Sequence, residues 1–339
     1  MESSSRLTGL LFATAALAFG QDIHPIANMF DPKATPADSV YNVSILMLAI
    51  CAAIFVVVGG LLAFTIVRFR RRSIDDPREP AQVYGSNRIE IAWTVLPVLI
   101  VVVLSMATAR AVVEVQNKRM PANALKVTVV GHQWWWEVRY PELGIVTANE
   151  IHVPLSTAAK PATTSLTLKS ADVAHSFWVP QLAGKMDAIP GITNTMWFDP
   201  RQEGIFLGNC AEYCGMQHAN MLLRVIVEPP AEFEKWAAAQ QLAAPSDPRL
   251  ESARATFLSI SCVNCHTVSG TTAKGTFGPD LSHMMSRATL GSGVIANTPE
   301  NLRAWVKDPQ IAKPGNLMPN MQLNSRELDE VVTYLSSLK

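Results

Sequence analysis

The sequence predicts a multidomain protein made of a hairpin of two membrane-spanning helices, an all-β domain and an all-α domain. Two long apolar runs, at residues 39–67 and 91–109, contain no charged side chain and predict the helices. Short runs of alternating apolar and polar residues follow between 125 and 227 and predict strands. Apolar residues at helical spacing return after 248. A chain of 339 residues has room for all three parts.

The composition excludes some functions and assigns the cysteines. The chain carries 28 basic and 28 acidic residues, so its charge gives no indication of nucleic-acid binding. Four of the five cysteines lie in two short motifs, and only Cys51 lies outside them. The cysteines therefore predict metal sites rather than a disulfide framework.

The first 20 residues are predicted to be a signal peptide. Arg6 precedes an apolar stretch, and the small residues around Ala16 offer a cleavage site after Ala18 or Gly20. The alternative is a third membrane helix, for which the stretch is too short.

Residues 21–116 are predicted to form the transmembrane hairpin, with helices at about 40–68 and 89–113. The second helix contains Pro97, which a membrane helix tolerates. Basic residues favour the cytoplasmic side, so the rest of the chain after the hairpin is expected outside the membrane. The prediction of this orientation rests on four arginines at the end of the first helix and directly after it, namely Arg68, Arg70, Arg71 and Arg72.

The β domain is predicted to cover residues 117–229 and to be a β-sandwich or a Greek-key barrel. Its strands are expected at 125–130, 134–140, 165–169 and 222–227. A helix and a linker follow at 230–248, where Pro245 and Pro248 mark a domain boundary. The α domain is predicted at 249–339, with helices at 250–259, 298–307 and 325–338.

One motif in the β domain has the donors that copper prefers. It reads Cys210-Ala-Glu-Tyr-Cys214-Gly-Met-Gln-His218-Ala-Asn-Met221 and combines thiolates, imidazole and thioether. His175 follows a predicted strand and could supply a second imidazole. A disulfide between Cys210 and Cys214 is one alternative, and a zinc site is another, although zinc rarely takes a thioether.

The second motif, Cys262-Val-Asn-Cys265-His266, has the spacing of a covalent c-type haem site. The two cysteines would form thioethers with the haem, and His266 would bind the iron. The sixth iron ligand is predicted to be Met318, which ends a Pro-Gly turn segment starting at Lys313. The competitors are Met321 and, less strongly, His283, which is expected at the surface.

The hairpin and the copper motif resemble cytochrome c oxidase subunit II over roughly residues 25 to 230. The resemblance also rests on the segments 131–136, 172–175 and 185–191. It implies a cupredoxin-like Greek-key β-barrel that holds a dinuclear, mixed-valence copper A centre. The bridging ligands would be Cys210 and Cys214. The terminal ligands implied are His175, His218, Met221 and the backbone carbonyl of Glu212.

The same resemblance implies three further roles. The Glu212 carboxylate would reach a magnesium ion shared with the catalytic subunit. Trp134 would be the residue through which electrons enter. Glu90 would mark the cytoplasmic mouth of a proton path in the neighbouring subunit, although a carboxylate at a helix start is also favoured by the helix dipole.

Residues 249–339 resemble a class I cytochrome c, including a loop at 278–281 whose proline carbonyl orients the proximal histidine. A fused cytochrome c domain is the arrangement of caa3-type haem-copper oxidases. The resemblance thus implies an electron-transfer subunit of a proton-translocating terminal oxidase in a bacterial inner membrane, with both redox domains on the periplasmic side. Electrons would pass from a cytochrome c or other donor to haem c, to copper A and on to the catalytic subunit I. Oxygen would be reduced to water there, with no catalytic residue on this chain.

Two alternatives predict different functions. A nitrous oxide reductase has a similar copper site but needs many more histidines than the seven of this chain. A membrane-anchored copper sensor or copper chaperone would exchange copper and carry no haem.

Overall fold

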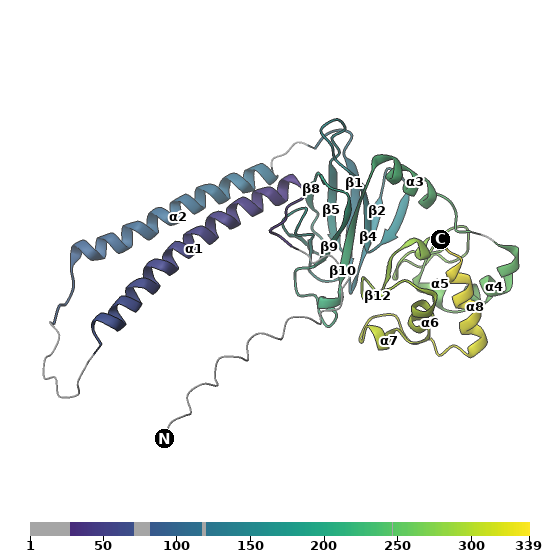
Figure 1. The fold of residues 1–339 in the computed structure, drawn as a ribbon. Helices are drawn as coiled ribbons and strands as arrows, with labels where there is room; N and C mark the ends of the chain where they lie inside the picture. Colours follow the sequence, from purple (N-terminus) through teal and green to yellow (C-terminus); the bar gives the residue numbers. More distant parts are fainter. Residues whose placement is uncertain (1–27, 71–81, 117–119, 246) are drawn as a thin grey trace, which may run out of the picture.

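A pair of long helices projects from one end of a β-sandwich, and a small helical domain packs beside the sandwich (Figure 1). The structure is a computed structural model that describes residues 28–70, 82–116, 120–245 and 247–339. The predicted signal peptide lies outside the described residues, as do two of the four arginines of the hairpin loop.

The hairpin consists of α1 (Thr35–Arg68) and α2 (Asn87–Gln116), which lie side by side (Figure 1). Both are long and apolar enough to cross a membrane. With 34 and 30 residues at a rise of about 1.5 Å each, they exceed a hydrocarbon core of about 30 Å. Both helices extend beyond the predicted bounds, α1 at its start and α2 at both ends. The extra residues at the start of α1 and at the end of α2 lie next to the β domain (Figure 1).

Direct hydrogen bonds attach the hairpin to the sandwich. The Asp199 carboxylate accepts from the backbone N–H and from Oγ1 of Thr35, at 2.8 and 2.7 Å. The Trp197 indole donates to the backbone carbonyl of Val115 at 2.7 Å. Both helices are thus attached to strand β8 (Asn194–Phe198) or to Asp199, the residue that follows it, which fixes the hairpin against the β domain.

Two five-stranded sheets form the sandwich, as one of the two predicted β architectures requires. Their orders are β3-β2-β1-β5-β8 and β4-β10-β9-β6-β7, and only the pairs β1–β5 and β4–β10 are parallel. Apolar residues that alternate along the strands fill the space between the sheets, with Trp136, Tyr140 and Phe177 among the fully buried ones. The bounds are β1 Leu125–His132, β2 Trp135–Tyr140, β3 Ile145–Ala148, β4 Glu150–Pro154, β5 Thr164–Ser170, β6 His175–Trp178, β7 Met186–Ala188, β8 Asn194–Phe198, β9 Gly204–Cys210 and β10 Leu222–Glu228.

The helical domain follows helix α3 (Pro230–Gln240) and the predicted linker. Its first and last helices cross where Phe257 meets Tyr334, with ring centroids 5.2 Å apart. A capping box between Asn324 and Glu327 starts the last helix at the predicted residue. The elements are η2 Pro248–Leu250, α4 Glu251–Ser259, α5 Cys262–Cys265, η3 Met284–Ser286, β11 Thr289–Leu290, β12 Ile295–Ala296, α6 Pro299–Lys307, α7 Pro309–Ala312 and α8 Ser325–Ser336.

Candidate metal centres

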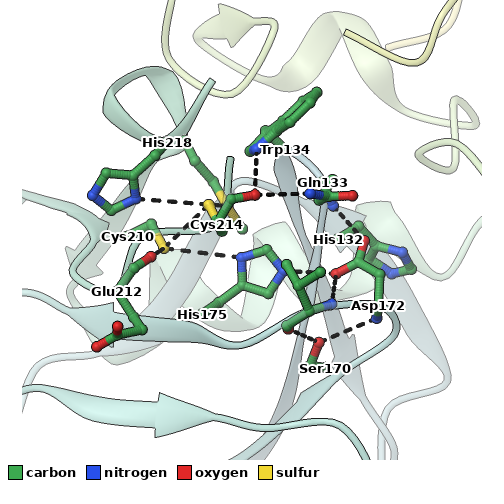
Figure 2. A network of polar contacts seen from close by, with 12 residues as sticks. His132, Gln133, Trp134, Ser170, Asp172, His175, Cys210, Glu212, Cys214 and His218 are labelled. Atoms are coloured by element: carbon green, nitrogen blue, oxygen red, sulfur yellow. Dashed lines mark hydrogen bonds and ion pairs between the residues drawn. The ribbon is translucent and has the colours of Figure 1, made fainter. Parts of the chain in front are cut away.

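Strand pairing brings the first cluster together at one end of the sandwich. His175 opens β6 and Cys210 ends β9, and these two strands are antiparallel neighbours. The loop after β9 carries Cys214 and His218, and it returns through Met221 into β10. Two strand ends and one loop therefore present both cysteines and both histidines to one point (Figure 2), and Met221 contacts Cys214 there.

Each thiol contacts one imidazole. Cys210 Sγ lies 3.9 Å from His175 Nδ1, and Cys214 Sγ lies 3.6 Å from His218 Nδ1. The two sulfurs are 3.8 Å apart, so no disulfide joins them. Cys214 Sγ is also 3.8 Å from the Met221 thioether.

These donors fit copper better than a single zinc ion. A metal bound to two sulfurs at roughly 2.3 Å each keeps the sulfurs within about 4.6 Å, which the pair satisfies. The backbone carbonyl of Glu212, 3.2 Å from Cys210 Sγ, adds a sixth donor to the two thiols, two imidazoles and one thioether. A structural zinc ion takes four ligands, so six soft and borderline donors suit a pair of copper ions.

The two thiols influence each other's ionisation. The hydrogen bond that the Cys214 thiol makes to Cys210 lowers the pKa of Cys210, and the same contact raises the pKa of Cys214. One thiolate is therefore ready to bind a cation, and binding would displace the proton of the other.

Asp172 orients one of the imidazoles, a role that the sequence analysis missed. Its carboxylate lies 2.8 Å from His175 Nε2, which turns Nδ1 toward the sulfurs. Burial raises the pKa of Asp172, but hydrogen bonds from His175 and from the backbone N–H groups of Val173 and Gln133 outweigh it and hold that pKa below its usual value. Such an outer carboxylate fixes both the tautomer and the direction of a ligating histidine.

Replacing Asp172 with alanine is expected to weaken copper binding by roughly 10- to 100-fold, because His175 loses the partner that fixes its ring. Copper retained per chain after titration with a chelator measures the effect. The control is Glu203→Ala, at an exposed position of the same domain. Equal retention in both variants would contradict the role of Asp172.

A cavity of about 500 Å³ occupies the helical domain and reaches the sandwich. Cys262, Cys265 and His266 line it, and so do both candidate methionines, Met318 and Met321. The backbone carbonyl of Pro279 accepts a hydrogen bond from His266 Nδ1 at 2.7 Å. The resemblance of the loop at 278–281 to that of a class I cytochrome c implies this contact. That bond leaves Nε2 unprotonated and free to bind iron. Burial lowers the pKa of His266, which keeps the imidazole neutral.

Further residues of the cavity fit a haem. Arg287 lines it, and burial lowers the pKa of its guanidinium, while the charges of Asp280 and Glu150 oppose that shift. An acidic group of a ligand would compensate the charge further, and haem carries two propionates. Gly278 lies against the His266 ring, where a Cβ would come within 2.6 Å of Cε1. No sequence motif marks Arg287, whose guanidinium donates to the carbonyl of Asp280 and to Thr147, which is 140 positions away.

The predicted surface position of His283 is wrong. This histidine is buried and does not line the cavity. Its Nδ1 lies 2.8 Å from the carbonyl oxygen of Lys339, and its Nε2 lies 3.0 Å from that of Leu242. Both ring nitrogens thus contact backbone carbonyls of the linker and the C-terminus. Neither nitrogen is available to bind iron, so His283 is not an iron ligand.

Trp134 lies between the two sites. It lines the haem-sized cavity, and its indole donates to the backbone carbonyl of Cys214 at 3.0 Å (Figure 2).

The carboxylates of Glu90 and Glu212 lie away from both sites. The Glu90 carboxylate accepts from the backbone N–H of Ser86 at the start of α2, which is the capping role, and the Glu212 side chain is exposed.

Comparison with known proteins identifies all three parts. The family description "Cytochrome C oxidase subunit II, transmembrane domain" matches residues 24–110, and "Cytochrome C oxidase subunit II, periplasmic domain" matches 146–228. "Cytochrome c" matches 251–339. A cytochrome c oxidase subunit 2 of Alkalihalophilus pseudofirmus is 33% identical over 91% of this chain and 90% of its own length. The chain belongs to the cytochrome c oxidase subunit II family.

A second relative is also a subunit 2 of cytochrome c oxidase, and one solved domain is similar to part of the chain. The cytochrome c oxidase subunit 2 of Bacillus subtilis is 31% identical over 97% of both chains. The solved periplasmic domain of subunit II from Bradyrhizobium japonicum is 30% identical over 36% of this chain and 96% of its own length, with a TM-score of 0.33. This subunit II is a membrane-anchored electron-transfer subunit of a terminal oxidase, which is an oxidoreductase complex of several subunits. Its domains are those that bind copper A and haem c.

Proposed function

We propose that this subunit receives electrons at a covalent haem c in its C-terminal domain and delivers them through copper A to the haem of the catalytic subunit, where oxygen is reduced to water. The position of Trp134 carries the proposal, because one residue lines the haem cavity and hydrogen-bonds to the copper-ligand loop. Electrons that enter the helical domain therefore have a short path toward the copper ligands.

In this proposal the thiolates of Cys210 and Cys214 would hold the two copper ions. His175, His218, Met221 and the carbonyl of Glu212 would complete the site. The pairing of each thiol with one imidazole supports the assignment. Copper A accepts and releases single electrons, and the strand ends hold its ligands still, so that little of the protein must rearrange when the charge changes.

In the helical domain, Cys262 and Cys265 would hold the haem covalently, and His266 and Met318 would bind its iron. A methionine in place of a second histidine would raise the haem potential. Arg287 is assigned to a haem propionate. This assignment rests on the cavity lining and on the hydrogen bond between His266 and Pro279.

The further assignments follow the family. Glu212 contributes its carboxylate to a magnesium ion shared with the catalytic subunit. The complex is a caa3-type oxidase in a bacterial inner membrane, with both redox domains on the periplasmic side.

The external donor is a cytochrome c or another small redox protein. It meets the helical domain at Phe277 and Leu317, which are both exposed and part of the cavity wall. Glu90 is assigned to the start of α2 rather than to a proton path, because its carboxylate already accepts from Ser86.

Rapid mixing of the purified oxidase with a reduced donor tests the proposal. The haem c absorption is expected to change first, and the near-infrared band of copper A is expected to bleach afterwards. Bleaching of copper before the haem would contradict the order of transfer. Exchangeable copper without covalent haem would support the copper sensor or chaperone instead.

A further inference from the structure

Lys313 forms an unusual contact between the two redox domains. Its side chain is 2% exposed, and Nζ donates to the backbone carbonyls of Trp134, Asn220 and Gly291, each at 2.8 Å. The first two belong to the sandwich and the third to the helical domain. An ammonium group has three donors, so this arrangement satisfies all of them.

The three carbonyls around Lys313 Nζ match the hydrogen-bonding capacity of its charged form. Three acceptors match three N–H donors, whereas a neutral amine would donate only two hydrogen bonds. Among the described residues Lys313 forms no ion pair with a carboxylate, and burial lowers its pKa to about 7. Removing a charge from water is unfavourable unless hydrogen bonds replace the solvent, and the three carbonyls supply those hydrogen bonds.

The residues after Lys313 pack on the copper-ligand loop. The Gln217 side chain donates to the backbone carbonyl of Pro314. Gly315 has a φ of +80° and lies against Met216, where a Cβ would come within 2.3 Å of the thioether sulfur. Both sandwich residues lie between Cys214 and His218. The segment 313–318, which we call the methionine loop, therefore rests on the loop that carries the copper ligands.

Lys313 also holds the backbone of Trp134. The backbone carbonyl of Trp134 accepts from Lys313, while its indole donates to the carbonyl of Cys214. The tryptophan is thus fixed at two points, its backbone and its ring. Further polar contacts close the same interface, since Ser292 and Leu222 exchange two hydrogen bonds.

We propose that Lys313 is a positioning residue that locks the methionine loop onto the copper-ligand loop and fixes Trp134 between the two redox sites. The helical domain is then docked in one orientation rather than moving freely on its linker. The identity of the two redox groups rests on the proposed function, whereas the lock between the domains does not.

Replacing Lys313 with leucine in the intact oxidase tests the lock. Three buried carbonyls lose their donor, and amide hydrogen exchange is expected to become at least about tenfold faster around 134–136, 218–222 and 289–293. Electron passage from the helical domain to the sandwich is expected to slow at least about tenfold, while the external donor reduces the haem at the unchanged rate. The control is Lys307→Leu, at an exposed position on α6.

A second variant covers the case in which Lys313→Leu fails to assemble. Gly315→Ala places a Cβ against Met216 and is expected to raise the same exchange rates without touching Lys313. The proposal is overturned if the amide hydrogens of either variant exchange at the wild-type rate. It is also overturned if Lys313→Leu loses copper or haem, because Lys313 would then support a metal site rather than the contact between the domains. Absence of electron passage in the wild type would refute the proposed function and leave the exchange measurement valid.

Discussion

Replacing Cys214 with serine is expected to abolish the copper centre and the oxidation of the external donor. Cys214 Sγ contacts three other donors, namely Cys210, His218 and Met221, and it is the cysteine that contacts the thioether. Residues that only orient metal ligands already cost roughly 10- to 100-fold in affinity or activity when replaced. Loss of the thiol that joins both halves of the site should therefore lower donor oxidation by more than about 100-fold.

The measurement combines copper content, the near-infrared band and the rate of donor oxidation in the purified oxidase. The matched control is Cys51→Ser, because Cys51 is an exposed cysteine on α1 far from the cluster in sequence. The haem of the helical domain should stay attached in both variants. Copper content that equals the wild type in Cys214→Ser would remove Cys214 from the ligand set.

The ligand residues could be predicted from the sequence because their chemistry is local. Cys210, Cys214 and His218 lie within nine consecutive positions, and such spacing limits the metals that can bind. The haem motif is even shorter. The haem motif lies on one short helical turn, whereas the copper motif begins at the end of β9 and depends on the neighbouring strand β6 to supply His175.

The residues that orient and join the sites could not be predicted, because their partners are distant in sequence. Lys313 and Trp134 are 179 positions apart, and Arg287 donates to Thr147 over 140 positions. Asp172 is the exception, because it is only three positions from His175, and a carboxylate this close to a candidate ligand is a signal in the sequence. A pattern of apolar and polar residues does not reveal which polar groups of two domains will meet.

The interface also changes what the fusion of the two domains achieves. A flexible tether raises the effective concentration of the attached domain but leaves its orientation open. Here Lys313, Gln217 and Ser292 form direct hydrogen bonds across the interface, which specify one orientation. Electron transfer between docked partners needs no encounter step, so its rate should depend little on ionic strength, unlike recruitment of a soluble donor by charge.

Replacing Met318 with leucine is expected to change the haem spectrum and to lower the haem potential, whereas Met321→Leu should leave both unchanged. Both methionines line the cavity, so geometry alone does not separate them. The hydrogen bonds of its backbone favour Met318 over Met321 as the iron ligand. Its backbone N–H donates to Asn316 Oδ1, and its carbonyl accepts from Gln310, which also donates to the carbonyl of Asn316.

The two variants form a matched pair, because each removes one thioether from the same cavity and retains an apolar side chain of similar size. Covalent haem content should be equal in both, since the thioether bonds involve Cys262 and Cys265. Loss of the sulfur-to-iron absorption band only in Met318→Leu would assign the ligand. The potential should fall with it, because a thioether stabilises the ferrous state relative to stronger donors. The opposite result would transfer the role to Met321, and the methionine loop locked by Lys313 would then fix Trp134 without holding the iron ligand.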